Sequence, residues 1–474
     1  MSRTPACSRM VGPALASAML LTLALAGCSS MAPPMERPAP PVAATFPGEA
    51  GAAPGALPAS AIDWQKFFGD ERLKRLIALA LENNRDLRIA VLNIEQARAQ
   101  FDIRRADQWP SVNAGLSGLR QPTAAGGISS TYTAGFLVTS YELDLFGRVR
   151  SLADAALAQY LASEEARKAV QISLVSAVAN AYLALQGDEE LLRVTKQTLD
   201  TRDTSYRLIK LRFDNGASSQ IDLRQAESLL ESARAALTAA TRQRALDQNA
   251  LVLLVGQPLP QDLPEGLSIT DAATLPELPV GLPSEVLVRR PDVRQAEQQL
   301  ISANANIGAA RAAYFPRITL TGSLGGASSE LSSLFSNGLA WSFAPLLLQP
   351  IFDAGRNEAN LKLSEVNRDI AVAQYERAIQ SAFREVADAL AGRATLGEQL
   401  RTLQALVRVE QDRYRLADLR YRNGASSFLD VLDTQRSLFT AQLLELQTQT
   451  QYQQNLVTLY RALGGGWTAD AQAQ

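Results

Sequence analysis

The sequence contains no histidine among its 474 residues. Histidine is the commonest metal ligand in proteins and the commonest general base, so its absence argues against a metalloenzyme or a hydrolase. The nucleotide-binding pattern GxxxxGK[ST] and the catalytic patterns GxSxG and HExxH are also missing. The sequence therefore predicts a protein that is not an enzyme and needs no metal or other cofactor.

Cysteine and excess charge are scarce as well. The two cysteines are Cys7 and Cys28, and the formal net charge is −2. Removal of residues 1–27 as a signal peptide would take away Arg3 and Arg9 and leave a charge of −4 (−2 minus 2). The mature chain would keep one cysteine, so no intramolecular disulfide could form. Its charge gives no indication of a nucleic-acid partner.

The amino terminus is typical of a secreted protein. Residues 11–26 form an apolar run that is short for a membrane helix and suits a signal peptide. The following Leu-Ala-Gly-Cys ends at Cys28 and resembles the bacterial lipobox, in which cleavage leaves a lipid-modified cysteine at the new amino terminus. An ordinary signal peptide is the alternative. Ser29 stands where an Asp would, by resemblance to sorted lipoproteins, retain the product at the inner membrane.

An internal repeat organises the rest of the chain. Residues 212–222 (RFDNGASSQID) and 420–430 (RYRNGASSFLD) share seven of eleven positions at an offset of 208. Glycine favours the left-handed conformation that ends a helix, and serine caps the next one. Both stretches are therefore predicted to be tips at which one long helix turns back into another.

The flanking segments repeat apolar residues every seven positions, which predicts helices that supercoil against their neighbours. A free coiled-coil rod is the alternative. A rod needs no strands, however, and each repeat also contains a predicted β-hairpin with one apolar face. A soluble, half-buried hairpin is the alternative for those strands. The predicted divisions are the signal peptide 1–27, a Pro/Ala/Gly-rich tether 28–61 outside any core, a first repeat 62–256 (hairpin 111–143, helices 148–213 and 220–255), a linker 257–283, a second repeat 284–464 (hairpin 317–350, helices 356–421 and 428–463) and a tail 465–474.

Four membrane strands cannot close a barrel, and an open edge in hydrocarbon leaves backbone groups unpaired. Two chains would give eight strands, whose side chains fill the lumen, whereas three would give twelve and an aqueous channel. The sequence therefore predicts that several chains share one barrel.

Several motifs, in order, resemble the TolC-like outer membrane factors, and most closely the OprM-type (NodT-type) lipoproteins that serve resistance-nodulation-division efflux pumps. These motifs are YELDLFGRVR (141–150), VRRPDVRQAE (288–297), AARAAYFPRITLTGSLG (309–325) and RYRNGASSFLDVLDTQRSLFTAQ (420–442). The resemblance implies a mainly α fold with two structural repeats, in which long coiled-coil helices form a trimeric α-barrel continuous with a 12-stranded outer membrane β-barrel.

The resemblance also implies a function. The homotrimer would be anchored in outer membrane lipid through Cys28, with its helices in the periplasm and an equatorial domain around the linker. It would engage a periplasmic adaptor and an inner membrane resistance-nodulation-division pump, and conduct drugs, dyes or detergents passively. A structural periplasm-spanning coiled-coil lipoprotein is the alternative, as is a duct of the same fold for metal ions or peptides, because the pump selects the cargo.

The resemblance places a periplasmic gate just after the second turn. Leu429 would form an apolar ring and Asp433 a carboxylate ring, and three such side chains at close quarters could occlude and charge a pore. The remaining implied gate residues are Arg436, Tyr421, Arg420, Asp430 and Asp222. For Asp430 and Asp222 the alternative is a first-turn residue that interacts with the helix dipole.

The exposed turns would dock the adaptor. Their residues are Asn215, Gly216, Ala217 and Ser218 in the first repeat, and Asn423, Gly424, Ala425 and Ser426 in the second. The alternative is that they are merely well-formed turns, since Asn-Gly and Ser suit turns anywhere. Ser426 stands where some family members have a basic residue, so the latch differs in detail here.

Overall fold

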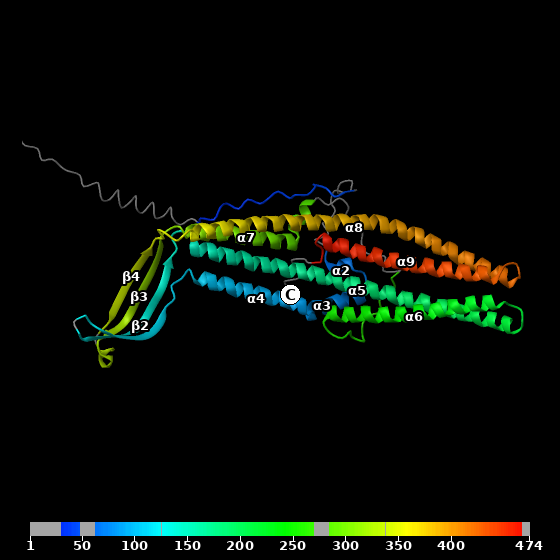
Figure 1. The fold of residues 1–474 in the computed structure, drawn as a ribbon, viewed down its shortest axis with the longest axis horizontal. Coiled ribbons are helices and arrows are strands. Elements are labelled where there is room, and N and C mark those ends of the chain that lie inside the picture. Colours follow the sequence, from blue (N-terminus) through cyan, green and yellow to red (C-terminus); the bar gives the residue numbers. More distant parts are fainter. Residues whose placement is uncertain (1–29, 48–61, 125, 270–283, 337, 467–474) are drawn as a thin grey trace, which may run out of the picture. The chain divides into compact units, whose positions relative to one another are not determined.

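The computed structural model describes residues 30–47, 62–124, 126–269, 284–336 and 338–466 (Figure 1). The expected signal peptide, Cys28, and parts of the tether, linker and tail lie outside these residues. The described chain is mainly helical with one four-stranded sheet, and each repeat contains a helix, two strands and two long helices in that order. The predicted mainly α fold with two repeats and few strands is therefore confirmed.

The first repeat holds α2 (Trp64–Phe67), α3 (Glu71–Asn83), α4 (Arg85–Ala106), β1 (Asn113–Pro122), β2 (Ile128–Leu143), α5 (Arg148–Asp214) and α6 (Gln220–Val255). The second holds η2 (Ser284–Arg289), α7 (Pro291–Ala312), β3 (Arg317–Ser328), η3 (Leu331–Ser333), β4 (Ala340–Leu348), α8 (Arg356–Arg422) and α9 (Phe428–Ala462). The chain forms two compact units: residues up to 39 with 93–164 and 295–376, and residues 40–92 with 165–294 and 377–474.

The first unit contains the sheet, whose strands are antiparallel and ordered β1-β2-β3-β4. The central β2–β3 pairing joins the two repeats, while β1 and β4 each pair on one side only. Gly135 and Gly325 lie opposite each other in this pairing. A Cβ on Gly325 would lie 2.1 Å from the Ala134 carbonyl oxygen and 2.6 Å from the Gly135 Cα, so only glycine fits there.

One face of the sheet exposes large apolar side chains. Phe136, Leu324 and Trp341 are aligned across β2, β3 and β4 and are 62%, 48% and 75% exposed. The neighbouring row on the opposite face includes Ser323 and Ser342, whose hydroxyl oxygens are 2.7 Å apart. So many exposed apolar side chains on one face of a sheet would be unfavourable in water. They fit a surface that contacts lipid.

The second unit contains the ends of the long helices and their return helices. Helix α6 ends at Gly256, which has a φ of 79° and lies so close to α3 that a Cβ there would be 2.4 Å from the Asn83 carbonyl oxygen. A buried network fixes the first described part of the linker: the Asp70 carboxylate accepts hydrogen bonds from the Tyr182 hydroxyl (2.8 Å) and the Leu267 N–H (3.0 Å). The same carboxylate caps α3.

The tether departs from the prediction. Residues 30–47 have no helix or strand, as an extended tether would, but they are docked onto the protein. The Asn304 amide donates to the Pro33 carbonyl (2.8 Å), and Arg37 forms an ion pair with Glu297. Phe46 is 4% exposed and stacks on Phe383 with a centroid distance of 4.9 Å. The expectation that this segment stays outside a core is wrong for Phe46, an isolated aromatic residue in a Pro/Ala-rich stretch.

Candidate gate at the helical hairpin tips

The two NGASS stretches form turns of the same geometry. Gly216 and Gly424 have φ values of 72° and 74°. The Ala217 N–H donates to the Arg212 carbonyl (2.7 Å), and the Ala425 N–H to the Arg420 carbonyl (2.8 Å), which closes each preceding helix with a six-to-one bond. Because these residues are repeated, each repeat builds the same tip from local hydrogen bonds alone.

The next residues start the return helices with capping boxes. Ser219 and Asp222 cap each other reciprocally at α6, and Ser427 and Asp430 do so at α9. The Ser219 hydroxyl, 2.8 Å from the Asp222 carboxylate, lowers the pKa of that carboxyl from its usual value. Within the chain, both aspartates are therefore capping residues in the first turn of a helix, and their gate role stays a prediction.

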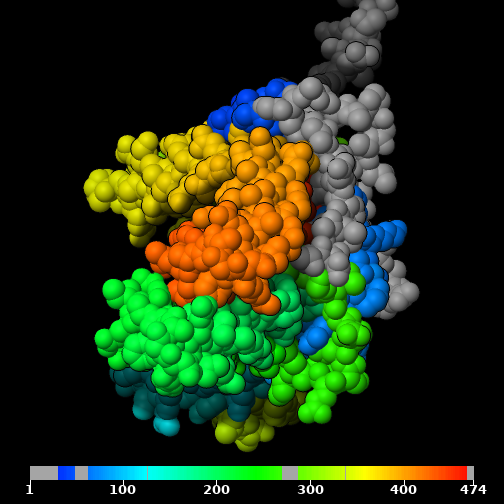
Figure 2. Space-filling view, turned by 90° about the vertical axis from the view of Figure 1, so that its right-hand side faces the viewer, coloured from blue at the N-terminus to red at the C-terminus, as the bar shows by residue number. Residues whose placement is uncertain are grey.

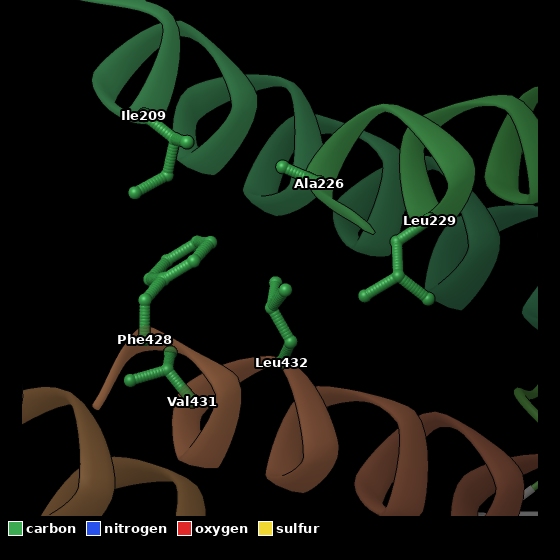
Figure 3. Close-up of a cluster of buried hydrophobic side chains, with 6 residues drawn as sticks. All are labelled: Ile209, Ala226, Leu229, Phe428, Val431 and Leu432. Atoms are coloured by element: carbon green, nitrogen blue, oxygen red, sulfur yellow. The ribbon is translucent and has the colours of Figure 1, made fainter. Parts of the chain in front are cut away.

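The two tips lie side by side, as the space-filling view shows in green and orange (Figure 2). A cluster of buried apolar residues joins them (Figure 3). Its members are Ile209 of α5, Ala226 and Leu229 of α6, and Phe428, Val431 and Leu432 of α9. Burial of these side chains holds the first hairpin against the second, at about 25 cal/mol per Å² of apolar surface.

Tyr421 connects the hairpins at the margin of this cluster. Arg212 donates a hydrogen bond to the Tyr421 hydroxyl, and its guanidinium lies 5.3 Å from the centre of the Tyr421 ring. The ring also packs on Phe428 at a centroid distance of 5.2 Å. Tyr421 therefore makes a polar contact between the repeats. Arg420, in contrast, donates to the Ala425 carbonyl of its own turn (3.3 Å).

Leu429 and Asp433 lie on the exposed side of α9. The Leu429 side chain is 50% exposed although Phe428 and Val431, beside it in the chain, are buried. Asp433 forms an ion pair with Arg413 of α8 (3.0 Å), which also contacts Glu410 (3.2 Å). Both predicted ring residues are thus available to a neighbouring molecule, and the carboxylate has a cation beside it.

Arg436 is exposed on α9, and no carboxylate of the described residues lies within ion-pair distance of it. It lies near Arg202, which is 4% exposed. Arg202 donates hydrogen bonds to the Leu229 carbonyl (3.0 Å) and the Ser232 hydroxyl (2.9 Å). Its guanidinium lies 5.2 Å from the centre of the Phe439 ring. Burial, and then the charge of Arg436, lower the pKa of Arg202. The structure therefore pairs Asp433 with Arg413 and leaves Arg436 outside any ion pair of the described chain.

Sequence reasoning missed Arg413, Arg212 and Arg202. The contact between Arg413 and Asp433 joins α8 to α9 across the second turn, and no spacing or motif in the sequence indicates it. The other two contacts join separate helices, and neither spacing nor motif indicates them. The described residues contain no group of three or more His, Cys, Asp or Glu side chains that could hold a metal ion.

Comparison with known proteins identifies the architecture around these tips. The family model for outer membrane efflux proteins matches residues 76–257 and 282–465, one stretch per repeat. The chain is 47% identical over 464 residues to outer membrane protein OprJ of Pseudomonas aeruginosa, with 95% of each chain covered. It is 46% identical over 464 residues to the toluene efflux pump outer membrane protein TtgC of Pseudomonas putida, with 96% of each covered.

A solved structure agrees with these relatives. The open state of the MtrE outer membrane channel of Neisseria gonorrhoeae has a TM-score of 0.85 and 42% identity, over 92% of this chain and 98% of that one. The predicted family, outer membrane location and role as the outer membrane component of efflux are thereby confirmed. The chain belongs to the outer membrane efflux protein family.

Proposed function

We propose that the chain is the exit duct of a tripartite efflux system and passes small toxic organic compounds outward without catalysis. Support comes from the similarity, over nearly the whole chain, to relatives named for the efflux of toluene and of antibiotics. The driving force would come from an inner membrane pump of the resistance-nodulation-division class, connected through a periplasmic adaptor.

The duct is a homotrimer in this proposal. One chain supplies four strands with an exposed apolar face that suits lipid, but its two edges are unpaired. Unpaired backbone groups are costly in a membrane unless the sheet closes. Three chains give twelve strands. A lipid on Cys28 would anchor each chain in the outer membrane, with the helical hairpins in the periplasm.

The gate in this proposal is the trimer of hairpin tips. Three Leu429 side chains occlude the pore by dewetting, and three Asp433 carboxylates make its mouth cation-selective. Tyr421, through Arg212, and the buried cluster keep the two hairpins of each chain together. The turns 215–219 and 423–427 are the surface that the adaptor contacts to separate the tips.

Planar-bilayer recording of the purified protein tests this function. We expect single-channel currents from the wild type. Leu429→Ala should give larger or more frequent openings, because three smaller side chains leave a wider constriction. Leu444→Ala is the matched control, since Leu444 is a half-exposed leucine on the same helix, away from the tip. Absence of current from a trimer verified by native mass spectrometry would favour a structural lipoprotein instead.

A further inference from the structure

A pocket of about 480 Å³ lies in the first unit at the end of the sheet where the strands give way to helices. Its walls are the end of β2 and the loop leading to α5, the loop between α7 and β3, and the segment from the end of β4 to the start of α8. Each of these three walls contributes one arginine to the lining: Arg148, Arg317 and Arg356.

The arginines outnumber the carboxylates of the pocket. The Glu142 carboxylate accepts two hydrogen bonds from Arg148 (2.8 and 2.7 Å) and one from Arg317 (2.6 Å), so two guanidinium groups share one negative charge. Asp144 is the other carboxylate of the lining, and it accepts the backbone N–H of Arg150 (2.7 Å). Three cations and two anions line the pocket, and Arg356 is the cation that pairs with neither of those carboxylates.

Two of the arginines are accessible. Arg356 is exposed, and within the described residues no carboxylate lies at ion-pair distance from its guanidinium. Arg317 is more than half exposed despite its contact with Glu142. Guanidinium groups bind phosphate oxygens in a bidentate manner, so two accessible arginines at the rim of one pocket suit a phosphate group.

The rest of the pocket and its surroundings are apolar. Phe146 stacks on Phe315 in the lining at a centroid distance of 4.7 Å. Ile351 and Phe352, which follow β4, are each 89% exposed, and Trp109, which precedes β1, is exposed at the same end of the sheet. Exposed aromatic and aliphatic residues beside arginines are typical of the boundary between lipid chains and water.

We propose that this pocket binds the phosphate of an anionic glycerophospholipid whose acyl chains lie against the exposed apolar face of the sheet. The inference rests on the proposed insertion of the sheet into the outer membrane. The exposed Arg356 and Arg317 guanidinium groups supply the charge complementarity, and the apolar rim supplies the surface that a free phosphate ion would leave unused. The lipid would bind in the leaflet next to the helices and support the strand–helix junctions.

The test is native mass spectrometry of the detergent-solubilised full chain with added lipids of defined structure. We expect dioleoylphosphatidylglycerol to remain bound, and dioleoylglycerol, which lacks the phosphate, to dissociate. Arg317→Gln with Arg356→Gln should weaken phosphatidylglycerol binding by about tenfold. Arg356→Gln alone, which breaks no ion pair of the described chain, keeps the test valid if the double variant folds poorly. Arg368→Gln, which changes a partly exposed arginine further along α8, is the control and should bind as the wild type does.

Three results would overturn the proposal: equal retention of phosphatidylglycerol by the variants and the wild type, equal retention of dioleoylglycerol, or displacement of the lipid by inorganic phosphate at the same concentration, which would indicate a free-anion site. Single-channel recording on the same preparation separates this inference from the proposed function. Retention of phosphatidylglycerol without current would support the lipid site and contradict the duct. Current together with equal retention of phosphatidylglycerol and dioleoylglycerol would support the duct and contradict the lipid site.

Discussion

Arg413 and Asp433 are each about half exposed, and ion pairs of this kind contribute about 0–1 kcal/mol to stability. Their importance to the tip is instead electrostatic. In a trimer the three Asp433 carboxylates would face a common axis, and each Arg413 would reduce the repulsion between them. In the proposed gate, the pair would keep the carboxylate ring closed at little cost to the fold of the single chain.

We therefore expect Arg413→Gln to raise the fraction of time that the channel is open in planar bilayers, because the carboxylates lose their counter-ions. Adding Asp433→Asn should reverse the effect. Arg415→Gln serves as the control, since Arg415 pairs with Asp412 on its own helix. If Arg413→Gln and Arg415→Gln gave the same open fraction, Arg413 would have no gate role.

Asp188 of α5 is a second informative residue. Its burial, and then the neighbouring Asp247 of α6, raise the pKa of its carboxyl to about 7, while Arg244 opposes the shift. The unfolded chain has a value near 3.9. Between these values the folded state binds more protons than the unfolded state, so this group contributes stability at low pH that is lost as pH rises through about 7.

Thermal unfolding should accordingly show a wild-type stability that falls between about pH 4 and about pH 7 and levels off above that range. Asp188→Asn should lose much of that dependence, because an amide cannot ionise. Asp200→Asn, an exposed change on the same helix, should keep the wild-type slope. A slope unchanged in Asp188→Asn would mean that another group titrates there.

At the level of helices and strands, local patterns carried most of the information. The repeated Asn-Gly-Ala-Ser-Ser predicts both turns and both caps, because the bonds that close them lie within six residues. The β2–β3 pairing across repeats has no such signal, since alternation specifies the faces of a strand but not its partner. The contacts of Arg212, Arg202 and Phe46 were unpredictable for the same reason: each joins segments distant in sequence.

The glycine pair in β2 and β3 permits a sharp prediction for the sheet. Gly325→Ala would force its methyl group against the Ala134 carbonyl oxygen and the two strands apart, at a cost of about 1–3 kcal/mol. We expect a lower yield of the folded oligomer and a lower temperature of dissociation on gels. Gly322→Ala is the control, because its nearest atom would be the Ser342 carbonyl oxygen at 3.3 Å. Equal behaviour of the two variants would show that the close approach has no energetic role.

For the whole molecule, the single chain is incomplete in a specific way. Strand β4 offers one free edge and β1 the other, so closure needs the β4 of one chain against the β1 of the next. Ser342→Pro with Phe343→Pro should abolish this closure, because successive residues donate to opposite sides of a strand and one of the two prolines must remove a required N–H. Native mass spectrometry should then find monomers where the wild type gives trimers, whereas Ser342→Ala with Phe343→Ala should still assemble.

The unpaired edges of β1 and β4 also determine how a mutation in one of two gene copies would affect the cell. A defective copy that keeps a sound β1 but a broken β4 can enter a ring and spoil it. If defective and normal chains are made in equal amounts and mix at random, only about one ring in eight contains normal chains alone. Damage to this strand should therefore be dominant: a cell with one good gene and one bad gene should tolerate toxic compounds nearly as poorly as a cell with none.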